Sequence, residues 1–162
     1  MGWLFIHGSS KSDIVNRLTA AEENETRRWE PLAHSIRGNV LWAVVELTKK
    51  QEQSCECFIA CYLLQSSRDS GWGYKEMTES MYPSYFSCPL KFLKMAPEAS
   101  PAWRDGVREY HQRRNRKVEV GQKISLTNAS IPCVIITSQK PLLGVHDGVN
   151  YRVPRRMLGD VI

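Results

Sequence analysis

The sequence has no hydrophobic run that approaches the roughly 20 residues needed to cross a bilayer, so we expect no membrane-spanning segment. Its opening residues, "MGWLFIHGSSKSD", have neither the basic region nor the long apolar core of a secretory signal peptide. They also lack a myristoylation site, because the position that needs Ser or Thr holds Ile6. These absences predict a soluble protein of the cytoplasm that makes no contact with a membrane.

No pair of cysteines has the Cys-x-x-Cys spacing, although the chain contains five cysteines, an odd number that agrees with a reducing compartment. Cys55, Cys57 and Cys61 fall in an alternating stretch, "SCECFIACYLL", that predicts a strand. Strand residues two apart lie about 7 Å from each other on one face, which is too wide for one zinc ion with bonds of about 2.3 Å. We therefore expect these cysteines to pack in the core, and we expect no metal and no cofactor.

The chain also lacks common catalytic motifs, including the Gly-x-Ser-x-Gly elbow and the His-Glu-x-x-His helix. The best candidate for catalysis is a central group, Lys75, Glu76, Glu79 and Ser80. Its two glutamates would act as acid and base from one helix face. The alternative is a solvated helix face without chemistry, and the missing motifs favour a protein that is not an enzyme.

What the sequence does contain is the composition of an ordinary globular protein, with 42% hydrophobic and 24% charged residues. A chain of 162 residues suffices for one domain or for two small lobes that share a core. We predict the α+β class: an antiparallel sheet with packed helices, and a small curled sheet at the C-terminal end. We expect residues 1–99 to form an N-terminal lobe, and residues 100–162 to add a basic helix and β-hairpins within one compact unit.

Alternation of apolar residues predicts an antiparallel hairpin over residues 40–47 and 54–64. An upstream stretch, "WEPLAHSIRG", predicts a third strand at a sheet edge, because Pro31 cannot donate a backbone hydrogen bond. Both faces of these strands are apolar, so we expect the sheet to be covered on both sides. Before it, we predict a short strand over residues 2–7 and a helix over residues 11–24 that begins with a capping box.

The stretch "SGWGYKEMTESMYPSYFSCP", residues 70–89, is rich in aromatic residues. Glycines and prolines predict a long loop over residues 66–89, with a short helix near residues 75–81 and a second helix from Pro89. The aromatic side chains either fold back as a plug over the sheet or form a platform for a partner or a nucleic-acid base. The candidate binding residues of this aromatic loop are Trp72, Tyr74, Lys75, Tyr82 and Tyr85.

The dipeptide Ser100-Pro101 predicts the start of a helix that extends to about residue 116, with Tyr110 on its apolar stripe. Beyond it, three stretches predict strands: "KVEVGQKISL", "IPCVIITS" and "LLGVHDGVNYRV". The Asp147-Gly148 pair inside the last stretch favours a two-residue hairpin turn. Together these strands resemble a small SH3-like sheet.

Positive charge is concentrated in the last third of the chain. Residues 1–60 contain seven Lys/Arg and eight Asp/Glu, residues 61–103 contain four of each, and residues 104–162 contain eleven and five. If the helix and the terminal hairpin pack together, their cations form one basic face for phosphates or for an acidic protein surface. The alternative is a solvated helix face. The predicted binding residues are Arg104, Arg108, Arg113, Arg114, Arg116, Lys117, Arg152, Arg155 and Arg156.

Several stretches make the sequence similar to an uncharacterised family of small proteins encoded by phages and other mobile elements: "MGWLFIHG", "GWGYKEMTESMYP", and "AWRDGVREYH" before "VEVGQKISL". This resemblance implies interference with a host defence system of the restriction or CRISPR type. Inhibitors that mimic DNA need dense negative charge, so the net charge of +5 is evidence against DNA mimicry.

The combined prediction is an accessory binding protein that inhibits host defence through a basic and aromatic surface. The expected partner is a host defence protein or nucleoprotein complex, or the phosphates of a nucleic acid. The alternative is an enzyme that acts on nucleic acid or modifies a host protein from a site in residues 70–89. The sequence leaves the oligomeric state open.

Overall fold

The computed structural model describes residues 2–78, 85–97 and 99–162. The chain divides into two compact units, unit 1 (Met1–Val107) and unit 2 (Arg108–Ile162). The boundary falls inside helix α3 (Pro101–Asn115), whereas the sequence suggested a division just before this helix. Helices combine with antiparallel sheets, which confirms the predicted α+β class. No helix of the described residues is long and apolar enough to span a membrane.

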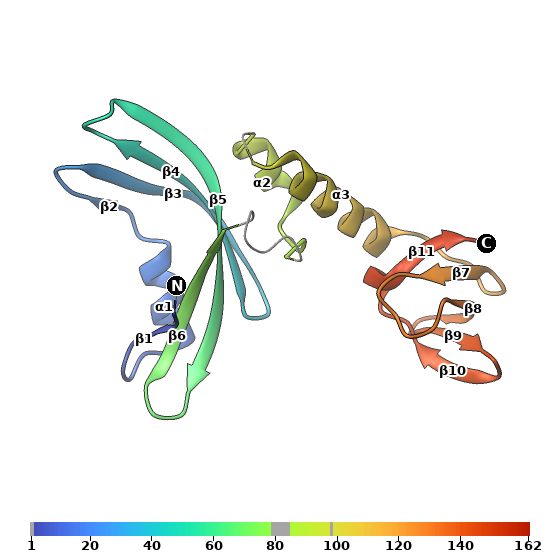
Figure 1. Cartoon of the computed structure of the whole chain (residues 1–162). Helices are drawn as coiled ribbons and strands as arrows, with labels where there is room; N and C mark the ends of the chain where they lie inside the picture. Colours follow the sequence, from blue (N-terminus) through green and yellow to red (C-terminus); the bar gives the residue numbers. More distant parts are fainter. Residues whose placement is uncertain (1, 79–84, 98) are drawn as a thin grey trace. The chain divides into compact units, whose positions relative to one another are not determined.

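The described part of unit 1 contains a six-stranded antiparallel sheet with the strand order β1-β6-β5-β4-β3-β2 (Figure 1). Its strands are β1 (Leu4–Phe5), β2 (Glu22–Glu23), β3 (Arg27–Arg37), β4 (Val40–Lys49), β5 (Ser54–Ser67) and β6 (Gly71–Thr78). The predicted hairpin is confirmed, since β4 and β5 pair from Val40 with Leu63 to Lys49 with Ser54. Pro31 lies next to a bulge in β3, beyond the two residues that pair with β2, so this part of β3 is an edge.

Helices cover both faces of this sheet, as the apolar pattern predicted (Figure 1). They are α1 (Lys11–Leu18) on one face, and α2 (Leu90–Met95) with the first part of α3 on the other. Alternate residues of β4 serve the two cores: Leu41 packs with Ile14 of α1, whereas Trp42 packs with Phe92 of α2 and Trp103 of α3. We call these the α1 face and the α2 face.

Helix α1 begins with the predicted capping box. The Ser10 backbone N–H donates to Asp13 Oδ2 at 2.7 Å, and the Asp13 N–H donates to Ser10 Oγ at 3.2 Å. The helix ends at Leu18 rather than at residue 24. The prediction was too long because Glu22–Glu23 pair with β3, and this tertiary pairing overrides the helical preference of the local sequence.

The predicted helix near residues 75–81 is wrong where the structure describes it. Residues 71–78 form β6, which pairs with β5 along its whole length, and residues 79–81 lie outside the described residues. The glycines of this segment contributed to the prediction of a loop, but Gly73 has a different role. A Cβ atom at Gly73 would lie 2.2 Å from the Leu4 carbonyl oxygen, so glycine permits the close approach of β1 to β6.

Helices α2 and α3 begin next to prolines, as the sequence predicted. Pro89 is the N-cap of α2, and α3 begins at Pro101. Near the start of α3, the Arg104 N–H donates to the Ser100 carbonyl oxygen at 3.0 Å. Helix α3 ends at Asn115, close to the predicted end, and its last turn is basic.

Unit 2 contains a five-stranded antiparallel sheet with the strand order β10-β9-β8-β7-β11, which is the order of an SH3-like sheet. Its strands are β7 (Lys123–Leu126), β8 (Cys133–Gln139), β9 (Leu142–His146), β10 (Val149–Arg152) and β11 (Leu158–Val161). A short 3-10 helix, η1 (Arg155–Met157), connects β10 to β11. Asp147 and Gly148 have φ values of 49° and 78°, which fits the predicted two-residue hairpin turn. The first predicted strand is shorter than expected, because residues 117–122 precede β7.

Candidate functional site

Two adjoining hollows in unit 2 bring together basic residues that are distant in the sequence. One has a volume of about 480 Å³ and the other about 350 Å³, and Arg114 and Arg155 line both. Five of the nine predicted basic residues line these hollows. They are Arg114, Arg116, Lys117, Arg155 and Arg156, which we call the basic cluster.

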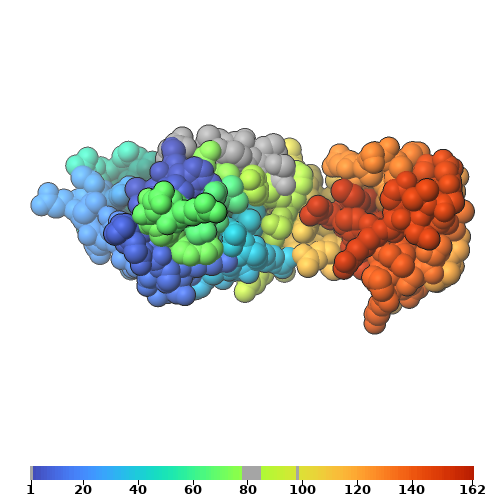
Figure 2. All heavy atoms as spheres, turned by 90° about the horizontal axis from the view of Figure 1, so that it is seen from below, coloured from blue at the N-terminus to red at the C-terminus, as the bar shows by residue number. Residues whose placement is uncertain are grey.

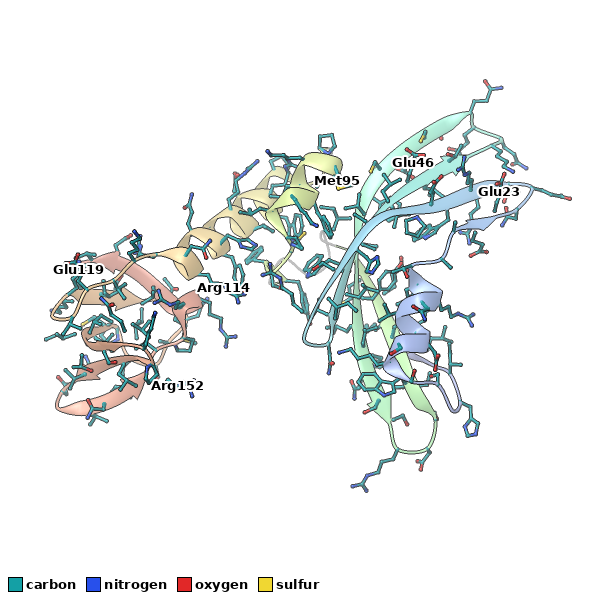
Figure 3. The ribbon with its side chains drawn as sticks, turned by 180° about the vertical axis from the view of Figure 1, so that it is seen from behind. Glu23, Glu46, Met95, Arg114, Glu119 and Arg152 are labelled. Atoms are coloured by element: carbon teal, nitrogen blue, oxygen red, sulfur yellow. The ribbon has the colours of Figure 1, made fainter. Side chains whose placement is uncertain are left out.

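The end of α3 and the 3-10 helix η1 position the basic cluster. Arg114 lies in the last turn of α3 (Figure 3), and Arg116 and Lys117 follow the helix directly. Arg155, in η1, donates from Nη1 to the Arg116 carbonyl oxygen at 2.8 Å. This hydrogen bond connects residues 39 positions apart, so the cluster depends on tertiary folding.

Most cations of the cluster have no carboxylate partner. Within the described ranges, no salt bridge involves Arg114, Lys117, Arg155 or Arg156. Arg116 differs, because its Nη2 lies 3.2 Å from Oδ1 of the exposed Asp160. Glu119 also lines the larger hollow. The cations therefore outnumber the nearby carboxylates, and the two hollows carry a surplus of positive charge.

One nitrogen of Arg116 is buried without a partner. Its Nη1 has no hydrogen-bond acceptor in the part of the chain that the structure describes, although its Nη2 pairs with Asp160. A buried N–H group without an acceptor costs about 1–3 kcal/mol, and more when the group is charged. Because Nη1 is enclosed, an anionic oxygen in the hollow would reach it only after the Arg116 side chain moves.

The other predicted basic residues lie elsewhere. Arg104 belongs to unit 1 and donates from Nη1 to the Ala96 carbonyl oxygen at 2.8 Å. Arg113 pairs with Glu109 and donates to the Thr127 hydroxyl at 3.3 Å. The two that remain, Arg108 on α3 and Arg152 on β10, are exposed and line neither hollow. Figure 3 places Arg152 well apart from Arg114.

The aromatic residues of the central segment do not form one platform. Trp72 and Tyr74 belong to β6 rather than to a loop, and both pack against the α1 face. Tyr85 packs against the α2 face, so the sheet separates it from the other two. Lys75 also lies on β6, and Tyr82 lies outside the described residues. The plug interpretation fits these positions better than the platform.

The catalytic alternative required two glutamates on one helix face, and the described residues do not show this arrangement. Glu76 lies on strand β6, so it does not share a helix face with another glutamate, and Glu79 and Ser80 lie outside the described residues. Glu76 does line a hollow of unit 1, but no histidine or cysteine is among the residues that line it. Acid–base chemistry by the predicted pair is therefore not supported by the described residues.

The three cysteines of β5 occupy different environments. Cys61 is buried in the core, as predicted, Cys57 packs partly against it, and Cys55 is exposed, contrary to the prediction. Burial raises the pKa of Cys61 to about 12, so its thiol stays protonated. The described residues contain no group of three or more His, Cys, Asp or Glu side chains that could hold a metal ion.

Sequence reasoning missed Tyr110, which lines the smaller hollow beside Arg114 and Arg155. Its hydroxyl accepts a hydrogen bond from Arg114 Nη1 at 3.4 Å. The sequence placed Tyr110 on the apolar stripe of the helix, and the spacing of four residues to Arg114 was the available signal for this contact.

Comparisons with protein-family models, with curated proteins and with solved structures found no match for this chain. The functional proposal therefore depends on the geometry and charge of the described residues. For this purpose the basic cluster, with its buried unpaired nitrogen, is the most informative site.

Proposed function

We propose that this protein is a binding protein rather than an enzyme, and that the basic cluster of unit 2 recognises phosphate groups. The observation that carries the proposal is the surplus of cations around the two hollows, one of which Arg116 also lines. Phosphate oxygens accept hydrogen bonds from guanidinium groups in a bidentate geometry. A phosphate in either hollow would be attracted by the guanidinium groups that line it.

A nucleic acid, free or within a nucleoprotein complex, is the partner class that fits this chemistry. Its backbone presents phosphates at regular spacing, so several cations can bind at once and release counterions. Contacts to phosphates position a protein without reading sequence. Tyr110 lines the smaller, adjoining hollow and offers an aromatic ring against which a base can stack.

The resemblance to proteins of phages and mobile elements gives this binding a biological setting. In that setting, the partner is a nucleoprotein complex of a host defence system of the restriction or CRISPR type, in the host cytoplasm. Binding would inhibit the complex by occupying its nucleic acid. The positive charge of unit 2 supports competition for nucleic acid and not mimicry of it.

The test compares two triple charge reversals in unit 2. The first, Arg114→Glu with Lys117→Glu and Arg156→Glu, changes cations of the basic cluster that form no salt bridge with another described residue. The second replaces exposed cations that line neither hollow. Its substitutions are Lys123→Glu, Lys140→Glu and Arg152→Glu. Each protein is titrated into fluorescently labelled single-stranded RNA and DNA of 20 nucleotides, and folding is checked by thermal unfolding.

We expect the first triple variant to bind at least about a hundredfold more weakly, because each charge-assisted hydrogen bond contributes about 1.5–3 kcal/mol. The second triple variant changes the net charge equally and should lose much less affinity. Equal losses in both variants would contradict a localised site. Absence of binding by the unaltered protein would contradict the proposal as a whole.

A further inference from the structure

A third hollow lies on the α1 face of unit 1, and the proposed phosphate binding makes no use of it. Helix α1 and β6 lie side by side on the surface of this unit (Figure 2). Because α1 ends at Leu18, it covers only part of the sheet face beneath it (Figure 1). The uncovered part forms a hollow of about 320 Å³, lined by the end of α1 and by residues of β2, β3, β5 and β6.

Aromatic residues from three strands form part of its lining. They are Trp29 of β3, Tyr62 of β5 and Tyr74 of β6. The Tyr62 and Tyr74 rings meet edge to face with their centroids 5.8 Å apart, and Trp29 meets Phe58 in the same manner at 5.4 Å. These contacts restrict the orientation of the rings in the lining.

Charged residues of both signs complete the lining. They are Arg17, Arg27, Glu22 and Glu76. None of the four takes part in a salt bridge with another described residue. The hollow therefore presents two guanidinium groups and two carboxylates, and none of these four groups is neutralised by a side chain of the described residues.

On β2 and β3, charged residues that neighbour the lining but point away from the hollow do form salt bridges. Glu23 pairs with Lys50 at 2.7 Å, and Arg28 pairs with Glu30. Glu22 and Trp29 are opposite each other in the strand pairing, as are Glu23 and Arg28 in the next position. On β2 and β3, therefore, the charges that form salt bridges lie on one side, and the charges that line the hollow lie on the other.

Glu76 also has a specific neighbour. It is directly opposite Tyr62 in the pairing of β5 with β6, so both side chains lie on the α1 face. Burial, and to a lesser extent the Glu76 charge, raise the pKa of Tyr62. The Tyr62 hydroxyl therefore stays protonated and adds a hydrogen-bond donor beside the carboxylate.

We propose that the unit 1 hollow binds a small zwitterion, a free amino acid that carries an ammonium group and a carboxylate. A glutamate of the lining binds the ammonium group, an arginine binds the carboxylate, and the rings contact the side chain. The arginines would repel a simple cation, and the glutamates would repel a simple anion. The hollow therefore disfavours a ligand that carries only one sign of charge. With a volume of about 320 Å³, the hollow has room for an amino acid.

The probe is L-phenylalanine, tested against two analogues that each lack one charge. Phenethylamine keeps the ring and the ammonium group, and 3-phenylpropionate keeps the ring and the carboxylate. Binding is followed in the full chain by the ¹H–¹⁵N NMR signal of the Trp29 indole, which lines the hollow. The Trp42 and Trp103 indoles are buried in the other core of unit 1 and serve as internal references.

We expect L-phenylalanine to shift the Trp29 signal in a saturable manner, and each analogue to bind at least about tenfold more weakly. Glu76→Gln and Arg27→Met should each weaken L-phenylalanine binding by about tenfold or more, since each removes one charged contact. The control variants Glu25→Gln and Arg37→Met remove exposed charges that do not line the hollow and should leave binding unchanged.

Several outcomes would overturn this proposal. Equal binding of the zwitterion and one analogue would reduce the hollow to a simple ion site. If L-phenylalanine causes no saturable shift while the reference signals remain native, the proposed binding site is contradicted. The triple reversals in unit 2 change no residue of this hollow, so the two experiments are independent. If L-phenylalanine does not bind, the phosphate proposal is unaffected. If RNA and DNA do not bind, the zwitterion proposal is unaffected.

Discussion

At the residue scale, two positions affect the structure around them: Arg116 beside a hollow of unit 2, and Gly73 between β1 and β6. The Arg116 guanidinium pairs Nη2 with Asp160 and buries Nη1 without an acceptor among the described residues, in a residue that lines a hollow of unit 2. Gly73 shows the same point for the backbone, since its missing side chain allows β1 to approach β6.

Gly73→Ala should destabilise the protein by about 1–3 kcal/mol, because the new methyl group overlaps the Leu4 carbonyl oxygen and the Phe5 side chain. Urea unfolding followed by tryptophan fluorescence measures the change. Gly2→Ala is the matched control, since a Cβ atom there meets nothing within 4 Å. Equal midpoints for the two variants would mean that β1 moves aside without cost.

At the element scale, alternation along each strand divides the sheet of unit 1 between two cores. Leu41 and Trp42, adjacent in β4, belong to different clusters, and β6 is likewise shared. The hollow in unit 1 follows from the short length of α1, which depends on the capping box at its start and on strand pairing after its end.

The stability of α1 should depend on pH through Asp13. Hydrogen bonds from the Ser10 backbone and hydroxyl lower the pKa of Asp13 below its ordinary value of 3.8. A lowered folded-state pKa means that the stabilisation is present above pH 3.8 and is lost as the pH falls below it. Asp13→Asn should therefore lower the thermal midpoint at pH 7, and the difference from the unaltered protein should narrow near pH 3.

Asp69→Asn, in the exposed turn between β5 and β6, is the control for the loss of one carboxylate. It should leave the midpoint nearly unchanged at both pH values. A gap between the Asp13 variant and the unaltered protein that stays constant from pH 7 to pH 3 would show that the capping box does not cause the effect.

Local features made parts of the fold predictable. The β4–β5 hairpin, the Asp147-Gly148 turn and the start of α3 depend on neighbouring residues, so periodicity and turn chemistry sufficed for them. Strand β6 was not predictable in this way, because Gly73 serves a contact with β1, which is distant in the sequence.

The sites show the same limit. Composition located the cations of the basic cluster, but the contact of Arg155 with the Arg116 carbonyl group comes from folding alone. The hollow in unit 1 gathers residues from Arg17 to Glu76, none of which forms a recognisable motif.

At the scale of the whole molecule, the two units differ in charge. Unit 2 contains ten Lys/Arg and four Asp/Glu, whereas unit 1 contains twelve and thirteen. The surplus of the chain is thus confined to the unit that carries the basic cluster. A phosphate-bearing partner would be attracted to unit 2, and a neutral zwitterion in unit 1 would bind with little dependence on salt.

Binding of labelled RNA should weaken steeply as salt increases. For the four cluster cations that form no salt bridge with another described residue, the slope of log affinity against log salt concentration should be about −3 with the single-stranded RNA. Arg114→Gln should make the slope shallower by about 0.7, and Lys140→Gln, outside the hollows, should leave it unchanged. A slope near zero, measured by fluorescence anisotropy over 50–300 mM salt, would contradict phosphate recognition.

The hydrogen bond from Arg155 to the Arg116 carbonyl group holds the Arg155 side chain in place before any partner binds, and this should lengthen the lifetime of a complex. Immobilising a free arginine at an interface costs about 0.5–1.5 kcal/mol, but this side chain is already held when the partner arrives. Recognition at this position is therefore coupled to the integrity of η1. A change at Pro154, the residue that precedes η1, would shorten the lifetime of the complex without altering any charge.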